Sequence, residues 1–319
     1  MKPFKTHRQQ LTILRSRGLL VNNGSKAIRI LERENYYTVI NGYKDFFLLR
    51  DEKNALVRPE RYKDNATFEE IYTLFKFDRE LRNCLLEYLL KFEASLKSKI
   101  SYRFSEKYKD AHAYLIYKNY SRDKGKVKDV LGVIATLSST LKNKSKNKTI
   151  SHYLDKHEGV PLWVLVKYLT LGNINYLYGC LTESLRNKIA KDFGDSYNRD
   201  YSCRIQFTPQ MLDAILKTAN FFRNVCAHEE RLYNYKINTP SRSRDISRTL
   251  NIPIDDINKG NVYSVVIFLK LVLPKSEYRN FIKKLDKLIN NYSSQFSSAN
   301  FNEIMLAMGF NDDWKFKTS

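Results

Sequence analysis

The sequence predicts an all-α protein, and three observations support this. Only 11 glycines and 7 prolines occur in 319 residues, which are too few turn-forming residues for a protein of many short strands. Apolar residues make up 43% of the chain, which is enough to form a core. They recur mainly at intervals of three and four residues, and this spacing places them on one side of a helix. Long helices with short connections are therefore expected.

Three helical segments are expected in the first fifty residues. Thr6 can cap the first helix, which Gly18 closes, and Ser25 opens the second. Residues 35–47 are rich in strand-forming residues, yet their aromatic and apolar side chains also fit helical spacing, so a helix is favoured over a strand. Residues 50–66 are polar, which predicts a loop.

The middle of the chain is expected to contain a long helix and a buried one. Residues 67–70 read Thr-Phe-Glu-Glu, the pattern of a capping box, and the helix that they open should run to about Lys109. After Pro161, the apolar residues 162–166 start another buried helix, which we expect to break at Gly172.

The C-terminal third begins with a clear helix start. Thr208 offers a capping hydroxyl, and Pro209 suits the first helical position. Beyond this helix we expect a polar loop, an apolar segment and two amphipathic helices, at residues 234–261, 262–273, 276–290 and 301–308.

The length allows one large core or two modest ones, since domains commonly contain roughly 100–200 residues. We divide the chain into an N-terminal helical region with a polar loop (residues 1–66), a helical core (67–235) and a C-terminal helical region (236–319). The last of these could also complete the core of the second.

The charge is strongly positive, with 55 Lys and Arg residues against 34 Asp and Glu residues, a net charge of +21. Nucleic acid is the commonest anionic partner of such a protein, and a membrane surface is the competing one. The 22 tyrosines could stack on bases, although most aromatic rings are expected in the core.

The most basic segment spans residues 118–148. Its end, residues 142–148, alternates Lys with Asn or Ser and is expected to be an exposed loop. Such a loop either improves solubility or contacts phosphates. The candidate RNA-binding residues are Lys124, Lys126, Lys128, Lys142, Lys144, Lys146, Lys148, Arg242 and Arg244.

A reducing compartment, the cytoplasm, is expected. The polar first residues do not resemble a signal peptide. The longest apolar run, residues 262–273, is shorter than the roughly 20 residues of a membrane span. The four cysteines are scattered and form no C-x-x-C pair: Cys84, Cys180, Cys203 and Cys226.

No cofactor and no metal ion are expected. The sequence has no Walker A loop, no G-x-G-x-x-G, no G-x-S-x-G and no pair of zinc-binding cysteines. His152 and His157, beside Asp155 and Glu158, leave a metal site open, but surface or capping histidines are the favoured interpretation.

One segment combines groups that could perform chemistry. Asn224 and His228 are four residues apart and would share a helix face, and the long side chain of Arg223 can swing towards it. These groups suffice for RNA cleavage without a metal. The imidazole would take the proton of the 2′-hydroxyl that attacks the phosphorus. The guanidinium would stabilise the charge on the phosphate, and the product would be a 2′,3′-cyclic phosphate.

The segment Arg223-Asn224-Val225-Cys226-Ala227-His228 resembles the R-N-x-x-x-H form of the motif of the HEPN superfamily. A wider pattern over about residues 5–235 resembles the Abi-like family (abortive infection, AbiD and AbiF type) within it. The blocks that carry this wider resemblance are Arg17-Gly18-Leu19, Asn35-Tyr36-Tyr37 before Gly42-Tyr43, Phe77-Asp78-Arg79-Glu80-Leu81-Arg82, Pro161-Leu162-Trp163 and Arg231-Leu232-Tyr233-Asn234.

This resemblance implies a HEPN-type helical bundle, here with extra helices at both ends, and a role in bacterial defence against phage. It implies RNA as substrate or partner and, because HEPN nucleases use two facing motifs, a homodimer. It also implies that a structured small RNA could hold the protein, as in a toxin–antitoxin pair. The sequence departs from the family at Glu229, where a second His often follows the motif. A carboxylate there would favour a protonated His228 or repel phosphate.

Three functions therefore remain open at this point. The first is an endoribonuclease that uses Arg223, Asn224 and His228. The second is a catalytically inactive RNA-binding module. The third is a protein that contacts other proteins or anionic membranes through its basic surface.

Overall fold

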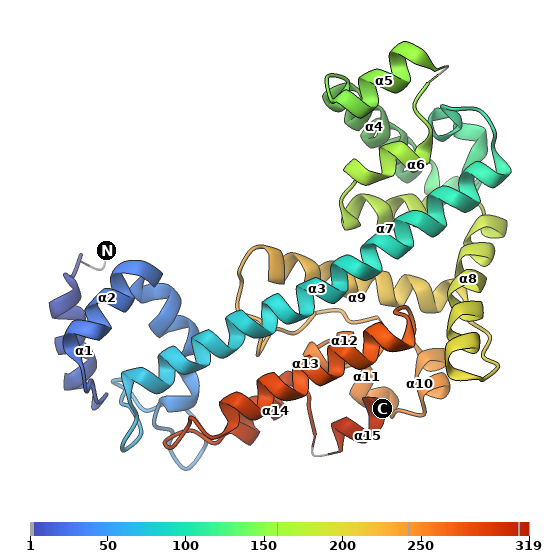
Figure 1. Ribbon diagram of the computed structural model, residues 1–319. Helices are drawn as coiled ribbons and strands as arrows, with labels where there is room; N and C mark the ends of the chain where they lie inside the picture. Colours follow the sequence, from blue (N-terminus) through green and yellow to red (C-terminus); the bar gives the residue numbers. More distant parts are fainter. Residues whose placement is uncertain (1–2, 158, 242, 312, 319) are drawn as a thin grey trace. The chain divides into compact units, whose positions relative to one another are not determined.

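The computed structural model describes residues 3–157, 159–241, 243–311 and 313–318. Within these ranges the regular elements are helices, joined by loops that contain a few isolated β-bridges and no strand (Figure 1). The prediction of an all-α protein is thus confirmed. No helix of the described part of the chain is both long and apolar enough to cross a membrane.

The chain forms two compact units, each built from separate stretches of sequence. The first unit contains residues 1–85, 225–235 and 280–316, and the second contains residues 86–224, 236–279 and 317–319. The division into three regions along the sequence stays a prediction.

The first unit is built around the N-terminal half of the longest helix. Its elements are α1 (His7–Ser16), α2 (Gly24–Glu34), a π-helix (Tyr37–Asn41), a 3-10 helix (Asp45–Phe47), the first part of α3 (Phe68–Lys107), most of α13 (Lys275–Ser293), α14 (Phe301–Met308) and most of α15 (Trp314–Thr318).

The helix starts in this unit follow side-chain caps. Thr6 caps α1 as predicted, but Asn23 and not Ser25 caps α2, since its Oδ1 accepts from the Lys26 amide at 2.8 Å. The capping box is confirmed, because the Glu70 amide donates to Thr67 Oγ1 at 3.1 Å and the Thr67 amide donates to Glu70 Oε2 at 3.2 Å. The helical interpretation of residues 35–47 is confirmed too, although the helix is of the π and 3-10 types.

The second unit contains the C-terminal half of α3 and the helices that gather around it. These are three 3-10 turns (Ala113–Leu115, Tyr117–Asn119 and Lys124–Lys126), α4 (Val127–Lys144), α5 (Lys148–Lys156), α6 (Leu162–Leu165) with a 3-10 turn (Val166–Tyr168), α7 (Leu171–Cys180), α8 (Glu183–Tyr201), most of α9 (Pro209–Ala227), α10 (Arg244–Leu250), α11 (Ile254–Ile257), α12 (Val262–Lys270) and the start of α13.

The prediction of a lysine-rich loop at residues 142–148 is wrong. Helix α4 continues to Lys144 and α5 begins at Lys148, so the connection has only three residues. Lys is a good helix former, and its long stem loses little freedom in a helix. Asn147 then caps α5 by accepting from the Thr149 amide at 3.1 Å.

The buried helix after Pro161 differs from expectation in two ways. The break comes at Leu169 and Thr170, because Thr170 forms a capping box with Asn173 that starts α7, and Gly172 lies inside α7. The side chain of Trp163 is 55% exposed, although its neighbours Leu162 and Leu165 are buried.

The prediction of a polar loop at residues 234–261 is also wrong, because this segment contains α10 and α11. Ser243 caps α10 by accepting from the Ile246 amide at 3.2 Å. Ile246, Ile252 and Ile257 are buried and attach these short helices to the core of the second unit. These three isoleucines, which stand among charged residues, were the feature of the sequence that indicated buried helices here.

Candidate functional site

Helix α9 carries the first two residues of the R-N-x-x-x-H motif in its last turns. Its start is as predicted, with Thr208 Oγ1 accepting from the Met211 amide at 3.2 Å. One side of the helix is buried, including Leu212, Ile215, Leu216 and Phe222. The other side exposes Lys217, Phe221 and Asn224. A helix that is largely core thus presents the motif asparagine to solvent.

Arg223 lies beside an acidic residue of α3 in the second unit. Its Nε is 3.6 Å from Glu93 Oε2, and both atoms are buried without a hydrogen bond in the described residues. The other carboxylate oxygen of Glu93 accepts from Lys97 Nζ at 2.7 Å. The Arg223 side chain keeps 26% of its surface exposed, so its guanidinium is oriented by a carboxylate yet remains partly accessible to an anion.

Sequence reasoning did not identify Glu93. The available signal was an acidic residue between Phe92 and Leu96, which are both buried, four residues before Lys97. A carboxylate at such a position needs cationic partners, because burying an unpaired charge is costly.

The end of α9 determines where His228 lies. The helix ends at Ala227, and the Glu230 amide donates to the Val225 carbonyl at 3.0 Å while the Glu229 amide donates to that of Cys226 at 3.4 Å. With Glu229 at φ +55°, this is a Schellman motif in which His228 is the C-cap residue. His228 is exposed in the first unit, and helical spacing no longer fixes its direction relative to Asn224.

The chain after His228 is held by a buried carboxylate of α3 in the first unit. Asp78 is 0% exposed and accepts from the amides of Leu232 at 3.1 Å and Tyr233 at 2.7 Å. It also accepts from the Tyr43 hydroxyl at 2.7 Å and from Arg82. Burial raises the pKa of Asp78, while Arg82 and the hydrogen bond from Tyr43 act in the opposite direction.

Arg82 completes this network, which we name the Asp78 anchor: Asp78, Arg82, Tyr43 and the backbone of residues 230–233. Arg82 Nη1 donates to the carbonyl of Glu230 at 3.2 Å. The backbone two to five residues beyond His228 is therefore fixed to α3 by charge-assisted hydrogen bonds, which are roughly twice as strong as neutral ones.

Glu229, the departure from the family motif, has a cation nearby. Hydrogen bonds to Glu34 are the main reason why the pKa of Arg79 is raised, and the charge of Glu229 adds to the effect. Arg79 donates to Glu34 at 3.2 and 2.5 Å. The negative charge of Glu229 is thus partly balanced within the first unit.

The cysteine inside the motif, Cys226, is buried, which disfavours the reactive thiolate form. Burial raises the pKa of the Cys226 thiol to about 12, so it stays protonated at neutral pH. The polar groups available for chemistry in this segment are those of Arg223, Asn224 and His228.

The candidate RNA-binding lysines fall into two groups at opposite ends of α4, roughly 20 Å apart by helical rise. One group is at the α4–α5 connection, where all four lysines are exposed: Lys142, Lys144, Lys146 and Lys148. In the other group, Lys124 and Lys128 are exposed, but Lys126 donates to the Gly179 carbonyl at 2.8 Å. Arg244 is exposed at the start of α10, and Arg242 lies outside the described residues.

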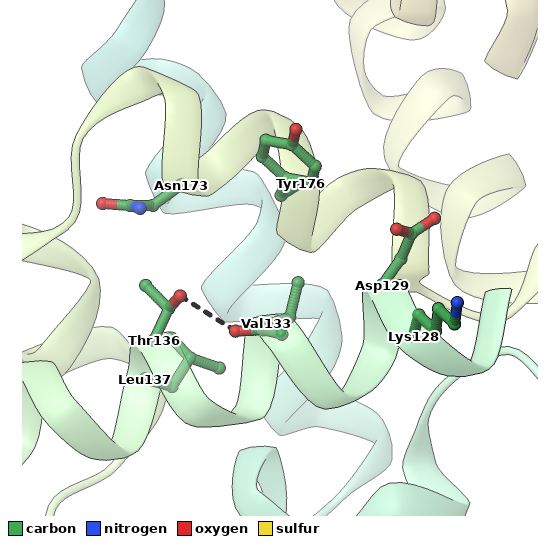
Figure 2. Close-up of a pocket in the computed structure, with 8 residues that line it drawn as sticks. Lys128, Asp129, Val133, Thr136, Leu137, Asn173 and Tyr176 are labelled. Carbon is green, nitrogen blue, oxygen red and sulfur yellow. Dashed lines mark hydrogen bonds between the residues drawn. The ribbon is translucent and has the colours of Figure 1, made fainter.

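A groove lies between α4 and α7 in the second unit, away from the motif in sequence. It has a volume of about 300 Å³. Figure 2 shows Asn173 and Tyr176 of α7 across from Thr136 and Leu137 of α4, with Lys128 at one end. The lining is mainly apolar, and the Tyr176 side chain is 65% exposed.

His152 of α5 and His157, the residue that follows this helix, form an aromatic cluster with Tyr153. The rings of His152 and His157 are 5.3 Å apart, and Tyr153 lies 4.9 Å from His157. Glu158, considered as a further metal ligand, lies outside the described residues. Within the described ranges, no three His, Cys, Asp or Glu residues are grouped so that they could hold a metal ion.

Comparison with known proteins shows the family to which the chain belongs. The model of the Abi-like protein family matches residues 29–234, about two thirds of the chain, and includes both the Asp78 anchor and the R-N-x-x-x-H segment. The chain belongs to the Abi-like protein family. This membership indicates a role in abortive infection, a defence function. No match was found among curated proteins or among solved structures.

Proposed function

We propose that the protein is a metal-independent endoribonuclease of the HEPN type that acts in abortive infection inside the bacterial cell. The observation that carries the proposal is that a partly exposed Arg223, oriented by Glu93, and an exposed His228 lie five residues apart at the end of one helix. Family membership and the net charge of +21 support RNA as the substrate.

In the proposed reaction His228 accepts the proton of a 2′-hydroxyl, whose oxygen attacks the neighbouring phosphorus. Arg223 binds the phosphate and stabilises the charge that develops on it, and Asn224 orients a phosphate oxygen or the imidazole. The 5′-oxygen leaves with a proton taken from water, and the resulting hydroxide removes the proton from His228. The other fragment ends in a 2′,3′-cyclic phosphate. A homodimer would bring two such motifs to one RNA.

The test is a cleavage assay in EDTA on protein freed of nucleic acid in high salt. Wild type is expected to cut RNA and leave cyclic phosphate ends. His228→Ala and Arg223→Ala should each lose at least 10²-fold in rate, the usual contribution of a general base or a charge-stabilising donor. If a variant cuts RNA as well as wild type does, the residue that it replaces takes no part in the mechanism.

The second candidate function is an RNA-binding module without cleavage activity, held by a structured small RNA. It is favoured by Glu93, whose carboxylate lies beside Arg223, and by Glu229, which directly follows His228, because negative charge at these positions opposes the approach of phosphate. RNA that copurifies and binds tightly to both wild type and His228→Ala, with no cleavage by either, would establish this function instead.

A further inference from the structure

A second hollow in the second unit is lined by residues of α3, by Lys109 just beyond the end of α3 and by Trp163 of α6. It has a volume of about 510 Å³. Its lining includes two aromatic rings, three serine hydroxyl groups and one ammonium group: Tyr102, Trp163, Ser98, Ser101, Ser105 and Lys109. The carboxylate of Glu106 also lines it and accepts hydrogen bonds from Arg103 at 2.9 and 3.1 Å. None of these residues belongs to the motif of α9.

Both aromatic rings of this hollow are exposed, Tyr102 by 63% and Trp163 by 55%. Side chains of this size usually bury most of their apolar surface. A ligand that covered these two exposed rings would therefore remove apolar surface from water. The Pro161-Leu162-Trp163 block is one of the family-like blocks that the proposed cleavage chemistry leaves unused.

The two rings are attached to rigid elements. Tyr102 is in the interior of α3, and the guanidinium of Arg103 lies 5.4 Å from the centre of its ring. Asp192 holds that guanidinium through hydrogen bonds of 2.6 and 2.9 Å. Trp163 projects from the first turn of α6, whose backbone the buried Leu162 and Leu165 fix. Rings on rigid elements lose less conformational entropy when a ligand binds than rings on flexible segments do.

Tyr102 and Ser98 also line a neighbouring hollow of about 370 Å³, which has a different chemistry. It contains the cationic side chains of Lys99, Arg103 and Arg199, together with Asp192 and Asp195. The Lys99 ammonium donates to the Asp192 carbonyl at 3.4 Å, and an ammonium group has three donors in total. The aromatic hollow thus adjoins a charged hollow in which three cationic side chains stand beside two carboxylates.

We propose that the hollow between Tyr102 and Trp163 binds an unpaired nucleobase of RNA, with an adjacent phosphate beside Lys99. Stacking on two exposed rings recognises the flat face of any base, and the hydroxyls of Ser98 and Ser105 can hydrogen-bond to its edge. The net charge of +21 favours a polyanionic guest over a neutral aromatic one. The inference rests on the proposed RNA-directed function and assigns the protein a preference for single-stranded RNA.

The fluorescence of Trp163 reports occupancy directly, because the chain has only two tryptophans. In a Trp314→Phe background Trp163 is the only one. The probes are a 2′-O-methyl oligoadenylate, which cannot form a cyclic phosphate, and an abasic oligonucleotide of the same length and charge. We expect the oligoadenylate to quench the fluorescence and the abasic oligonucleotide to leave it nearly unchanged.

Affinity for a labelled oligoadenylate, measured by anisotropy, provides the second readout. Tyr102→Ala and Trp163→Ala should each weaken binding by roughly tenfold, as expected for the loss of one stacked base. Trp163→Phe should retain most of the affinity. The matched control is Tyr176→Ala, which removes an equally exposed ring from the groove between α4 and α7 and should bind like wild type.

The outcomes separate this proposal from the function on which it rests. If wild type binds and cleaves RNA but Trp163 fluorescence does not respond and both alanine variants bind normally, the nucleobase site is overturned and the proposed function stands. Equal quenching by the abasic oligonucleotide also overturns it, because stacking is then not involved. If wild type binds no RNA at all, both proposals fail.

Discussion

Arg223 Nε and Glu93 Oε2 face each other at 3.6 Å, beyond hydrogen-bond distance, in a part of the second unit where both atoms are buried. The carboxylate is shared, since its other oxygen accepts from Lys97. The cation that would bind phosphate in the proposed reaction is therefore oriented by a weak contact and not held by a hydrogen bond. Glu93 is in this view a positioning residue for Arg223.

Glu93→Gln tests this role, since glutamine keeps the shape of the side chain but lacks its charge. We expect kcat for RNA cleavage to fall by roughly ten- to hundredfold, because small errors in the position of a catalytic group have effects of this size. KM should stay equal or fall, because no carboxylate then competes with the phosphate for the guanidinium of Arg223. Steady-state kinetics on a short RNA measures both constants.

The control for this variant is Glu87→Gln, which removes a charge from a half-buried position of the same helix, 3.6 Å from Lys91. It should leave both constants unchanged. A Glu93→Gln protein with normal kcat would show that Arg223 needs no positioning by this carboxylate.

The Asp78 anchor predicts a large and non-additive effect on stability. Asp78→Ala removes a buried partner of Arg82 and the acceptor of two amides. It should lower the free energy of unfolding by about 3–5 kcal/mol, because the remaining charge is buried and uncompensated.

A double-mutant cycle with Arg82→Ala measures the coupling within the anchor. The double variant should be more stable than the sum of the two single effects predicts, by about 1–3 kcal/mol. Denaturant unfolding of the four proteins provides the numbers. Additive losses would mean that the two side chains act independently.

Glu70 links stability to pH in the first unit. Its burial raises its pKa, but hydrogen bonds from Ser298 and Ser297 together outweigh this, so the pKa is lowered below the usual 4.5. A lowered pKa in the folded state means that the ionised group stabilises the fold at pH values above 4.5, and that this contribution is lost as the pH falls through the folded-state pKa.

Glu70→Gln should therefore destabilise the protein at pH 7 by about 1–3 kcal/mol, the cost of weakening hydrogen bonds to a charged group. The difference from wild type should shrink as the pH drops from 5 towards 3. Denaturant unfolding across this range checks the sign. A difference that is constant with pH would mean that the charge of Glu70 has no part in holding Ser297 and Ser298.

Local signals in the sequence predicted much of the fold. Thr6, Thr67 and Thr208 each start a helix as expected, because capping depends on a few neighbouring residues. Errors arose where tertiary packing overrode local polarity. Residues 244–257 are polar enough for a loop, but a few buried isoleucines fix two short helices there.

The site was predictable only in part. Arg223, Asn224 and His228 were found because they are close in sequence and match a family pattern. Glu93 lies 130 positions before Arg223, and Asp78 lies even further from the segment that it anchors. A single sequence carries no sign of such pairings, because they depend on how α3 packs within each unit.

The exposed lysines at the α4–α5 connection predict a specific change in the salt dependence of RNA binding. Each phosphate contact that is formed on binding releases counterions, so log K falls with log salt by about 0.7 per contact with single-stranded RNA. Replacing Lys144, Lys146 and Lys148 with Gln should therefore weaken binding at low salt and reduce the slope by roughly 2. Lys144 also lies 5.9 Å from the ring of Tyr168, which holds it near the connection.

Anisotropy titrations of a 2′-O-methyl oligonucleotide at several salt concentrations measure this slope without interference from cleavage. The matched control replaces three exposed lysines of the first unit, Lys5, Lys26 and Lys53, and so removes the same net charge. If the control lowers the slope as much as the α4–α5 variant does, RNA responds to the overall charge of the protein and not to this surface. A reduced slope in the α4–α5 variant alone would place about three phosphates against the connection between α4 and α5.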